Sequence, residues 1–144
     1  PSLDILSEVS YKVKPIALHL ADPEALRING FNEAEWLFAL DLKPALENLS
    51  AKIANAVMVA QNVTFDWSFL DRAFKKSNLK NPLHYHKLDL ISLAYGKLHN
   101  DPRAERFSLQ ALANHFGIKN EQAHTALSDV KTTLAIYKKL FALK

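Results

Sequence analysis

The chain contains no cysteine among its 144 residues, which excludes disulfide bonds and thiolate metal sites. It also lacks any uncharged apolar run of the roughly 18 residues that would span a membrane. The N-terminal residues show no basic segment followed by an apolar one, so no signal peptide is visible. Internal repeats, low-complexity stretches and interdomain linkers are absent as well. These absences are compatible with a reducing compartment, and we expect the cytoplasm.

The bulk composition is that of one ordinary globular domain. Apolar residues make up 49% of the chain and charged residues 23%, as is usual for globular proteins. A chain of this length buries about 68–70% of its unfolded surface, so we expect a single domain over residues 1–144. The net charge is only +3. The lysine clusters Lys75-Lys76-Lys80 and Lys138-Lys139-Lys144 could contact phosphates, but solvated helix faces explain them more simply.

Apolar periodicity predicts strands that alternate with helices. Residues 3–14 alternate between apolar and polar side chains, as a half-buried strand does, and Pro15 ends the pattern. The apolar run at residues 56–60 predicts a strand buried on both faces. Helices are expected at 23–28, after Asn32 with an interruption or restart at Pro44, and at 66–77, 88–98, 109–116 and 125–143. This order of elements indicates an α/β layered domain.

Asp66 lies between the predicted strand at 56–60 and the helix that follows it. Ligands of open α/β sheets bind outside the carboxyl ends of the strands. A carboxylate at that edge, beside a helix N-terminus, favours its ionised form and can face a hard cation. The alternative is a simple helix N-cap, a role that aspartate often fills.

His124 and Asp129 open the last predicted helix, five residues apart. Five residues turn a helix by about 500°, which leaves two side chains about 140° apart around the axis. The two groups converge better if His124 precedes the helix and Asp129 lies one turn inside it. A surface histidine beside an unrelated helix acid is the alternative for this pair taken alone.

Four blocks, in order along the chain, are similar to the DEDDh branch of the DnaQ-like 3′–5′ exonuclease family. The blocks are residues 22–31, residues 62–70 around Phe65-Asp66, residues 87–94, and residues 107–129, which contain Phe116-Gly117-Ile118, Ala123-His124 and Asp129. The resemblance covers residues 8–142. Each block alone is weak, whereas four in order with family-like spacing are a strong indication.

The resemblance implies a ribonuclease H-like fold, a mixed sheet flanked by helices, and an exonuclease that removes nucleotides from DNA or RNA 3′ ends. By this resemblance Asp66 and Asp129 ligate Mg²⁺ or Mn²⁺, with two ions in a complete site, and His124 is the general base. A two-ion site suits phosphodiester hydrolysis, and an imidazole suits proton abstraction at neutral pH. Ile28, Asn29 and Phe65 match positions that contact the terminal nucleotide, although core packing is the alternative for Ile28 and Phe65. A homodimer or a polymerase subunit is a further implication.

Two departures from the family pattern limit this interpretation. Gln61 replaces a usual histidine, which is a mild change. The family's first motif, an Asp-x-Glu on the central strand, has no convincing match. Asp22-Pro23-Glu24 has the right residue types, but proline would deny a central strand its hydrogen bond. We therefore expect an N-terminally incomplete domain lacking its first strands, with an unpaired edge beside residues 56–60. The alternative function is a catalytically inactive binding or scaffolding module. The remaining alternative is an unrelated α/β domain whose similarity to the family is due to chance.

Overall fold

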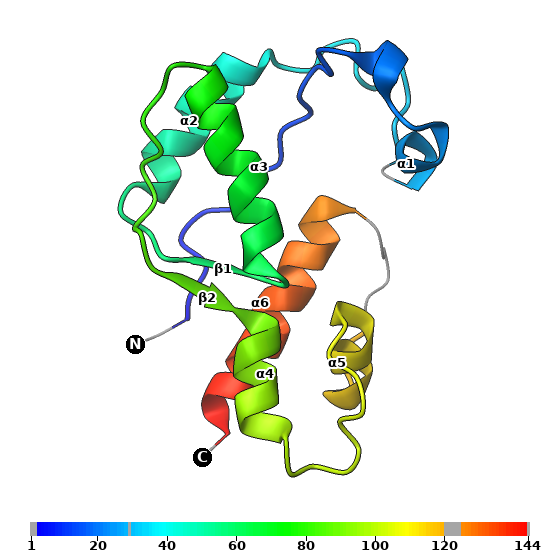
Figure 1. Ribbon diagram of the computed structural model, residues 1–144, viewed down its shortest axis with the longest axis vertical. Helices are drawn as coiled ribbons and strands as arrows, with labels where there is room; N and C mark the ends of the chain where they lie inside the picture. Colours follow the sequence, from blue (N-terminus) through cyan, green and yellow to red (C-terminus); the bar gives the residue numbers. More distant parts are fainter. Residues whose placement is uncertain (1–2, 29, 120–124, 144) are drawn as a thin grey trace.

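The computed structural model describes residues 3–28, 30–119 and 125–143 (Figure 1). In chain order its elements are a 3-10 helix Leu18–Leu20, α1 Pro23–Ile28, α2 Leu42–Ile53, β1 Met58–Ala60, α3 Val63–Lys76, β2 Lys87–Asp89, α4 Leu90–Leu98, α5 Leu109–His115 and α6 Ala126–Ala142. Helices α2 and α3 lie side by side in one half of the molecule, and α4, α5 and α6 lie in the other (Figure 1). Within the described ranges, no helix has the length and apolar character needed to cross a lipid bilayer.

The strands β1 and β2 form a two-stranded parallel sheet. Met58 pairs with Lys87 and Ala60 with Asp89, so the carboxyl ends of both strands lie at one edge. A strand within the predicted range 56–60 is therefore confirmed, at Met58–Ala60, but its burial on both faces is wrong, because all three residues of β1 are only half-buried. A sheet of two strands cannot enclose β1, and among the described residues no strand pairs with its other edge.

The principal core lies between α4, α5 and α6, where residues at helical spacing meet. Its buried members are Leu90, Ala94, Leu98, Leu112, Ala113, Ile136 and Leu140. Buried residues also lie on α2 (Ala45 and Leu46) and on α3 (Val63 and Phe74), and these two helices contact each other. The two groups fix α3 and α6, which carry the predicted acidic residues.

The helix ends follow the local signals in the sequence. The Asp22 carboxylate accepts hydrogen bonds from the backbone amides of Glu24 and Ala25 and begins α1. Ser108 and Thr125 cap α5 and α6 in the same way, through Ala111 and Ser128. These three predicted helix starts are confirmed.

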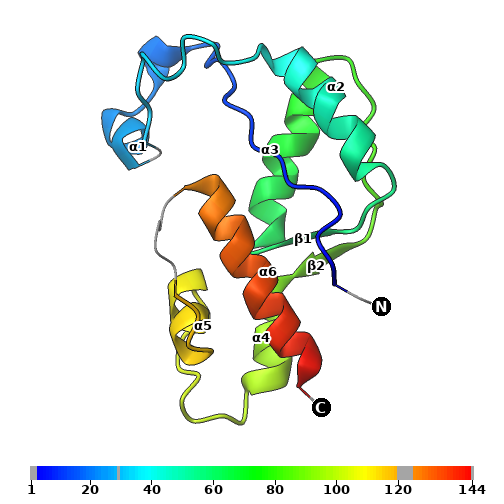
Figure 2. The ribbon, with the colours of Figure 1, turned by 180° about the vertical axis from the view of Figure 1, so that it is seen from behind.

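The predicted strand at residues 3–14 is wrong. The segment is extended, but among the described residues its one strand-like pairing is the isolated bridge between Val13 and Leu40. Alternation places apolar side chains on one face, yet a strand also needs a neighbour for its backbone groups. Here the segment passes over α6 and α2 instead (Figure 2). The helix expected after Asn32 is a series of turns, and the next helix begins only at Leu42.

Candidate active site

The candidate active site lies at the carboxyl edge of the two strands. After Ala60 the chain turns through Gln61 and Asn62 into α3, and after Asp89 it enters α4 directly. Asn62 has a left-handed backbone (φ 59°), a conformation that asparagine tolerates better than most residues. This turn sets the direction in which α3 leaves the sheet.

The Asp89 carboxylate joins the two helices at this edge. One oxygen accepts a hydrogen bond of 2.7 Å from the Val63 backbone amide, and the other accepts one of 3.0 Å from the Ser92 amide. Asp89 therefore caps its own helix, α4, and also holds the first residue of α3. A carboxylate between two helix N-termini is further favoured by the helix dipoles.

Gln61 fixes the other side of the same turn. Its side-chain amide donates a hydrogen bond of 2.7 Å to the Phe107 carbonyl, just before α5. Its side-chain oxygen is buried and has no partner within the described residues. The turn that leads into α3 is thus held by contacts from two segments distant in the sequence.

Asp66 lies in the first turn of α3, four residues after the N-cap position. It is not the helix cap, which was the alternative from sequence. Partial burial of the carboxyl raises the pKa of Asp66, and a hydrogen bond to its own backbone amide opposes that shift. The residue as a whole is exposed, so we regard the desolvation as modest.

Asp129 lies in the first turn of α6 and is half-buried. Its backbone amide donates to the Thr125 carbonyl, which makes it part of the first hydrogen-bonded turn. Among the described residues neither Asp66 nor Asp129 forms an ion pair with a lysine or arginine. Both predicted carboxylates therefore remain available to a cation.

The described residues alone do not assemble a complete cation site. No three histidine, aspartate or glutamate side chains in those ranges lie close enough to hold one ion. His124, the predicted general base, lies outside the described residues. Asp22 and Glu24 add no carboxylates to the candidate site. Their segment forms the start of α1, and Glu24 forms an ion pair with Arg27.

Two of the predicted nucleotide-binding residues, Ile28 and Phe65, lie on the surface. Ile28 ends α1 with 51% of its area exposed, and Phe65 in α3 is 59% exposed. Core packing, the alternative that the sequence left open for both, is therefore excluded in the described chain. Helix α1 stands away from α3 in Figure 1. Asn29 lies outside the described residues.

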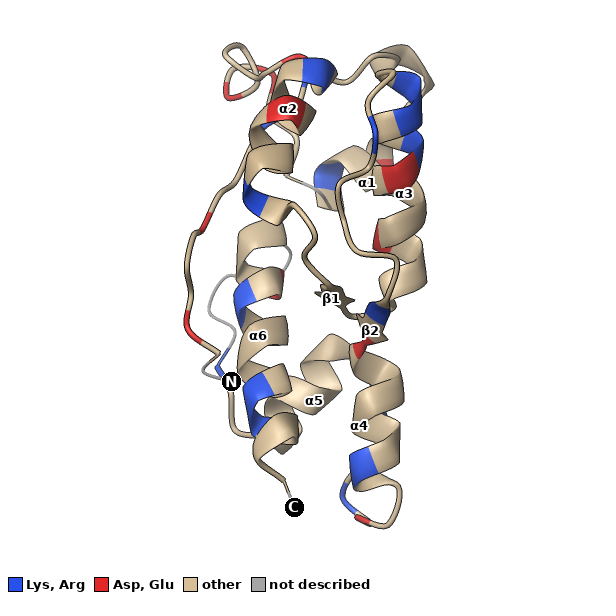
Figure 3. Cartoon of the chain, turned by 90° about the vertical axis from the view of Figure 1, so that its left-hand side faces the viewer, with Lys and Arg blue, Asp and Glu red and all other residues tan. Residues whose placement is uncertain are grey.

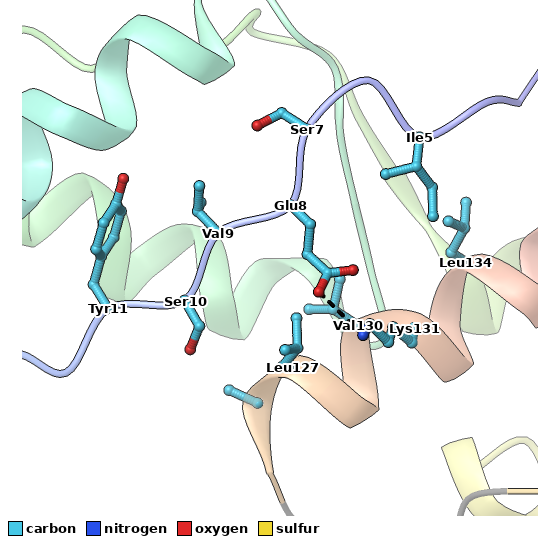
Figure 4. A pocket seen from close by; sticks show the side chains of 11 residues that line it. Ile5, Ser7, Glu8, Val9, Ser10, Tyr11, Leu127, Val130, Lys131 and Leu134 are labelled. Carbon is cyan, nitrogen blue, oxygen red and sulfur yellow. Dashed lines mark ion pairs between the residues drawn. The ribbon is translucent and has the colours of Figure 1, made fainter. Parts of the chain in front are cut away.

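A cavity of about 410 Å³ lies between the N-terminal segment and α6. Ile5 points toward Leu134 across it, and Glu8 forms an ion pair of 3.0 Å with Lys131 (Figure 4). Its lining is mainly apolar and contains neither predicted acid. We therefore regard it as a packing gap under a loosely held segment rather than as the reactive site.

Sequence reasoning missed the roles of Asp89 and Gln61. An aspartate before the apolar residues of α4 is a recognisable cap signal, and Asp89 fills that role. Its second bond, to Val63, joins residues 26 positions apart. No local pattern could predict that contact.

Comparison with known proteins identifies the class. The family model described as exonuclease matches residues 2–137. Ribonuclease T of Salmonella typhimurium is 30% identical over 142 residues, which cover 88% of this chain and 63% of the relative. The chain thus spans less than two thirds of that relative's length.

Two longer proteins contain a similar segment. The 3′–5′ exonuclease DinG of Staphylococcus epidermidis is 33% identical over 91 residues, or 62% of this chain and 9% of DinG. The PolC-type DNA polymerase III of Clostridium perfringens is 33% identical over 88 residues, or 60% of this chain and 6% of the polymerase. Together with the family match, these similarities define an α/β domain of an exonuclease family. The chain belongs to the DnaQ-like 3′–5′ exonuclease family.

Proposed function

We propose that this chain contributes the later part of a metal-dependent 3′–5′ exonuclease domain with a ribonuclease H-like fold. The observation that carries the proposal is that Asp66 and Asp129 each occupy the first turn of a helix, at the positions where the family's second and third motifs provide carboxylates. The first of these helices leaves the carboxyl edge of the sheet, where ligands of such sheets bind.

The chain's own residues have distinct roles in this proposal. Asp66 and Asp129 offer oxygen donors, which Mg²⁺ and Mn²⁺ prefer. His124 accepts the proton of the attacking water, and Phe65 stacks on the 3′-terminal nucleotide. Ile28 and Asn29 contact the same nucleotide from the α1 side.

The donor set is incomplete within these 144 residues. A hard divalent ion takes about six oxygen ligands, and the described residues bring no three ligating groups together. When bound, two ions would stabilise the attacking and the leaving oxygens of the phosphodiester. The further carboxylates would come from an Asp-x-Glu strand outside this sequence, which would pair beside β1.

The substrate is proposed as a DNA or RNA 3′ end, without a choice between them, because no reader of the 2′-hydroxyl can be named. A homodimer or attachment to a polymerase are the proposed assemblies. The basis for the second is that the PolC-type polymerase contains a segment similar to this chain.

A second candidate function is a binding or scaffolding module without hydrolysis. The observation that favours it is the absence of a three-residue ligand group in the described ranges. Retention of Asp66, His124 and Asp129 together argues against it, since a module that binds without metal has no physical need for this combination.

The experiment compares this chain with one extended at its N-terminus by the Asp-x-Glu strand. Single strands labelled at the 5′ end are incubated with Mg²⁺ or Mn²⁺, and the shortened products are resolved by length. We expect stepwise shortening from the 3′ end by the extended chain, lost in Asp129→Ala and in chelator. Metal-independent binding without shortening by either chain would favour the second function.

A further inference from the structure

We propose that an exposed stripe on α3, formed by Phe65, Phe69, Arg72 and Lys76, binds the stretch of single-stranded nucleic acid that adjoins the 3′-terminal nucleotide. The inference deepens the proposed function and rests on it for the position of the 3′ end beside Phe65. It adds Phe69 and Arg72, which no sequence motif singled out for binding, and it gives a specific role to Lys76, one member of the lysine cluster Lys75-Lys76-Lys80.

The four residues lie on one face of α3. They follow one another at spacings of four, three and four, which places them in a row along a helix. The two phenylalanines are 59% and 64% exposed, and their ring centroids lie 4.9 Å apart. The opposite face carries the buried Phe74. The stripe is therefore a solvent face that presents a pair of aromatic rings, not a part of the core.

The two cations of the stripe have no acidic partner in the described chain. Neither Arg72 nor Lys76 forms an ion pair there. The neighbouring Lys75 is different, because its ammonium group lies 2.6 Å from the Asp71 carboxylate. In Figure 3 the basic residues of α3 gather toward its C-terminal end, and its acidic residues lie nearer to the strands. The charge of the stripe is thus free to meet phosphates.

The order of residues along the stripe suits a single strand. Aromatic rings stack on bases without regard to their identity, while arginine and lysine contact the backbone. Phe65 directly precedes Asp66, so the aromatic end is next to the proposed reactive edge. The cationic end lies about 16 Å away, at about 1.5 Å per helical residue. That length suits a few nucleotides upstream of the terminal one.

Charge complementarity selects this occupant over a protein. An apolar partner would be opposed by two unpaired cations at one end, and exposed side-by-side aromatic rings commonly mark a binding site. The remaining aromatic residue near this helix start, Trp67, is already covered, because the Lys87 ammonium group lies 3.9 Å from its ring. Phe65 and Phe69 are left as the free stacking platform.

The test measures binding of a labelled dinucleotide and of a strand of roughly ten nucleotides by fluorescence anisotropy, in chelator, across a salt series. The variants are Arg72→Gln with Lys76→Gln, and separately Phe69→Ala. The matched control is Lys75→Gln with Lys80→Gln, which changes the net charge by the same amount outside the stripe. Circular dichroism melts check that every variant folds.

We expect the double variant Arg72→Gln with Lys76→Gln to bind the long strand more weakly. The slope of log affinity against log salt concentration should become shallower by about 1.4, at about 0.7 per phosphate contact. Phe69→Ala should weaken it roughly 5- to 150-fold, the range for one stacked base. In the double variant of Arg72 and Lys76, binding of the dinucleotide should change little, because the dinucleotide reaches only the aromatic end of the stripe. The control pair should retain most of the salt slope.

The inference is overturned if the control variant weakens binding of the long strand as much as the double variant of Arg72 and Lys76 does. It is also overturned if that double variant weakens binding of the dinucleotide equally, or if the wild-type chain binds no single strand. Failure of the proposed function has a different outcome. In that case the stripe variants lose affinity as expected, while no metal ion restores hydrolysis in the extended chain.

Discussion

The Asp89 carboxylate and the Val63 backbone amide are 2.7 Å apart, although 26 residues separate them in the chain. This hydrogen bond connects the end of β2 to the start of α3. The same carboxylate caps α4 through Ser92. The direction of α3, and with it the placement of Asp66, therefore depends on a side chain from the neighbouring strand.

Asp89→Ala should lower the free energy of unfolding by about 1–3 kcal/mol, because two backbone amides lose their acceptor. Ser108→Ala, which removes the cap of α5, serves as the control and should cost about 1 kcal/mol. Urea unfolding followed by circular dichroism measures both. In the extended chain, only Asp89→Ala should also raise the Mg²⁺ concentration needed for half-maximal hydrolysis. Equal effects of the two variants on that concentration would contradict a role for Asp89 in positioning Asp66.

Replacing Asp66 or Asp129, the two predicted metal ligands, should abolish most of the hydrolytic activity. Asp66→Asn and Asp129→Asn should each reduce hydrolysis by the extended chain by at least about 100-fold, since even outer-shell changes at metal sites cost about 10–100-fold. Gel analysis of the products measures this. Normal rates in both variants would remove them from the reactive site.

The stability of Asp66→Asn follows from the sign of its pKa shift. Burial raises the pKa of Asp66 in the folded chain, so folding favours the protonated carboxyl and the ionised form reduces stability above that pKa. Asparagine resembles the neutral form. The variant should therefore melt at an equal or slightly higher temperature than the wild type at pH 7, with the difference disappearing below about pH 4. A markedly lower melting temperature at pH 7 would contradict this sign.

Asp101 should make the fold sensitive to acid. Hydrogen bonds from the Arg103 side chain and backbone, with the charges of Arg103 and His115, hold the pKa of Asp101 well below its ordinary value of 3.8. A lowered pKa contributes stability above the unfolded-state value, and that contribution is lost as the pH falls below about 4. Asp101→Asn should melt at a lower temperature than the wild type at pH 7. Its melting temperature should also fall less than that of the wild type between pH 5 and pH 2. Parallel melting curves for the two proteins over that range would refute the prediction.

The stability of the fold should be most sensitive to shortening the buried side chains between α4, α5 and α6. Leu112 is completely buried there, so Leu112→Ala should cost about 2–5 kcal/mol of unfolding free energy. Leu37 is 70% exposed, and Leu37→Ala should change stability by less than about 0.5 kcal/mol. Chemical denaturation distinguishes the two. A similar small effect at both positions would mean that the three helices are not the main source of stability.

The sequence predicts those features that depend on neighbouring residues. The helix starts near Asp22, Ser108 and Thr125 and the apolar spacing of α3, α5 and α6 are local, and each was confirmed. The segment 3–14 has the periodicity of a strand, but periodicity does not supply a pairing partner. Strand β2 was missed because three residues carry too little pattern.

The candidate site was predictable in its residue types and only partly in its geometry. Asp66 and Asp129 each lie in the first turn of a helix, although α3 begins at Val63 and not at residue 66 as predicted. The contacts that fix the Gln61 turn come from Asp89 and Phe107, 26 and 46 residues away from their partners. Such contacts depend on tertiary packing, which a one-dimensional pattern does not contain.

The N-terminal extended segment should be the first part of the chain to unfold locally. Among the described residues, the backbone amides of residues 3–11 donate no hydrogen bond within the chain, and the side-chain ties are Glu8 with Lys131 and Ser7 with Lys52. Amide protons there should exchange with deuterated solvent long before those of α4 or α6. A protease should accordingly nick this stretch first and leave the three-helix core intact.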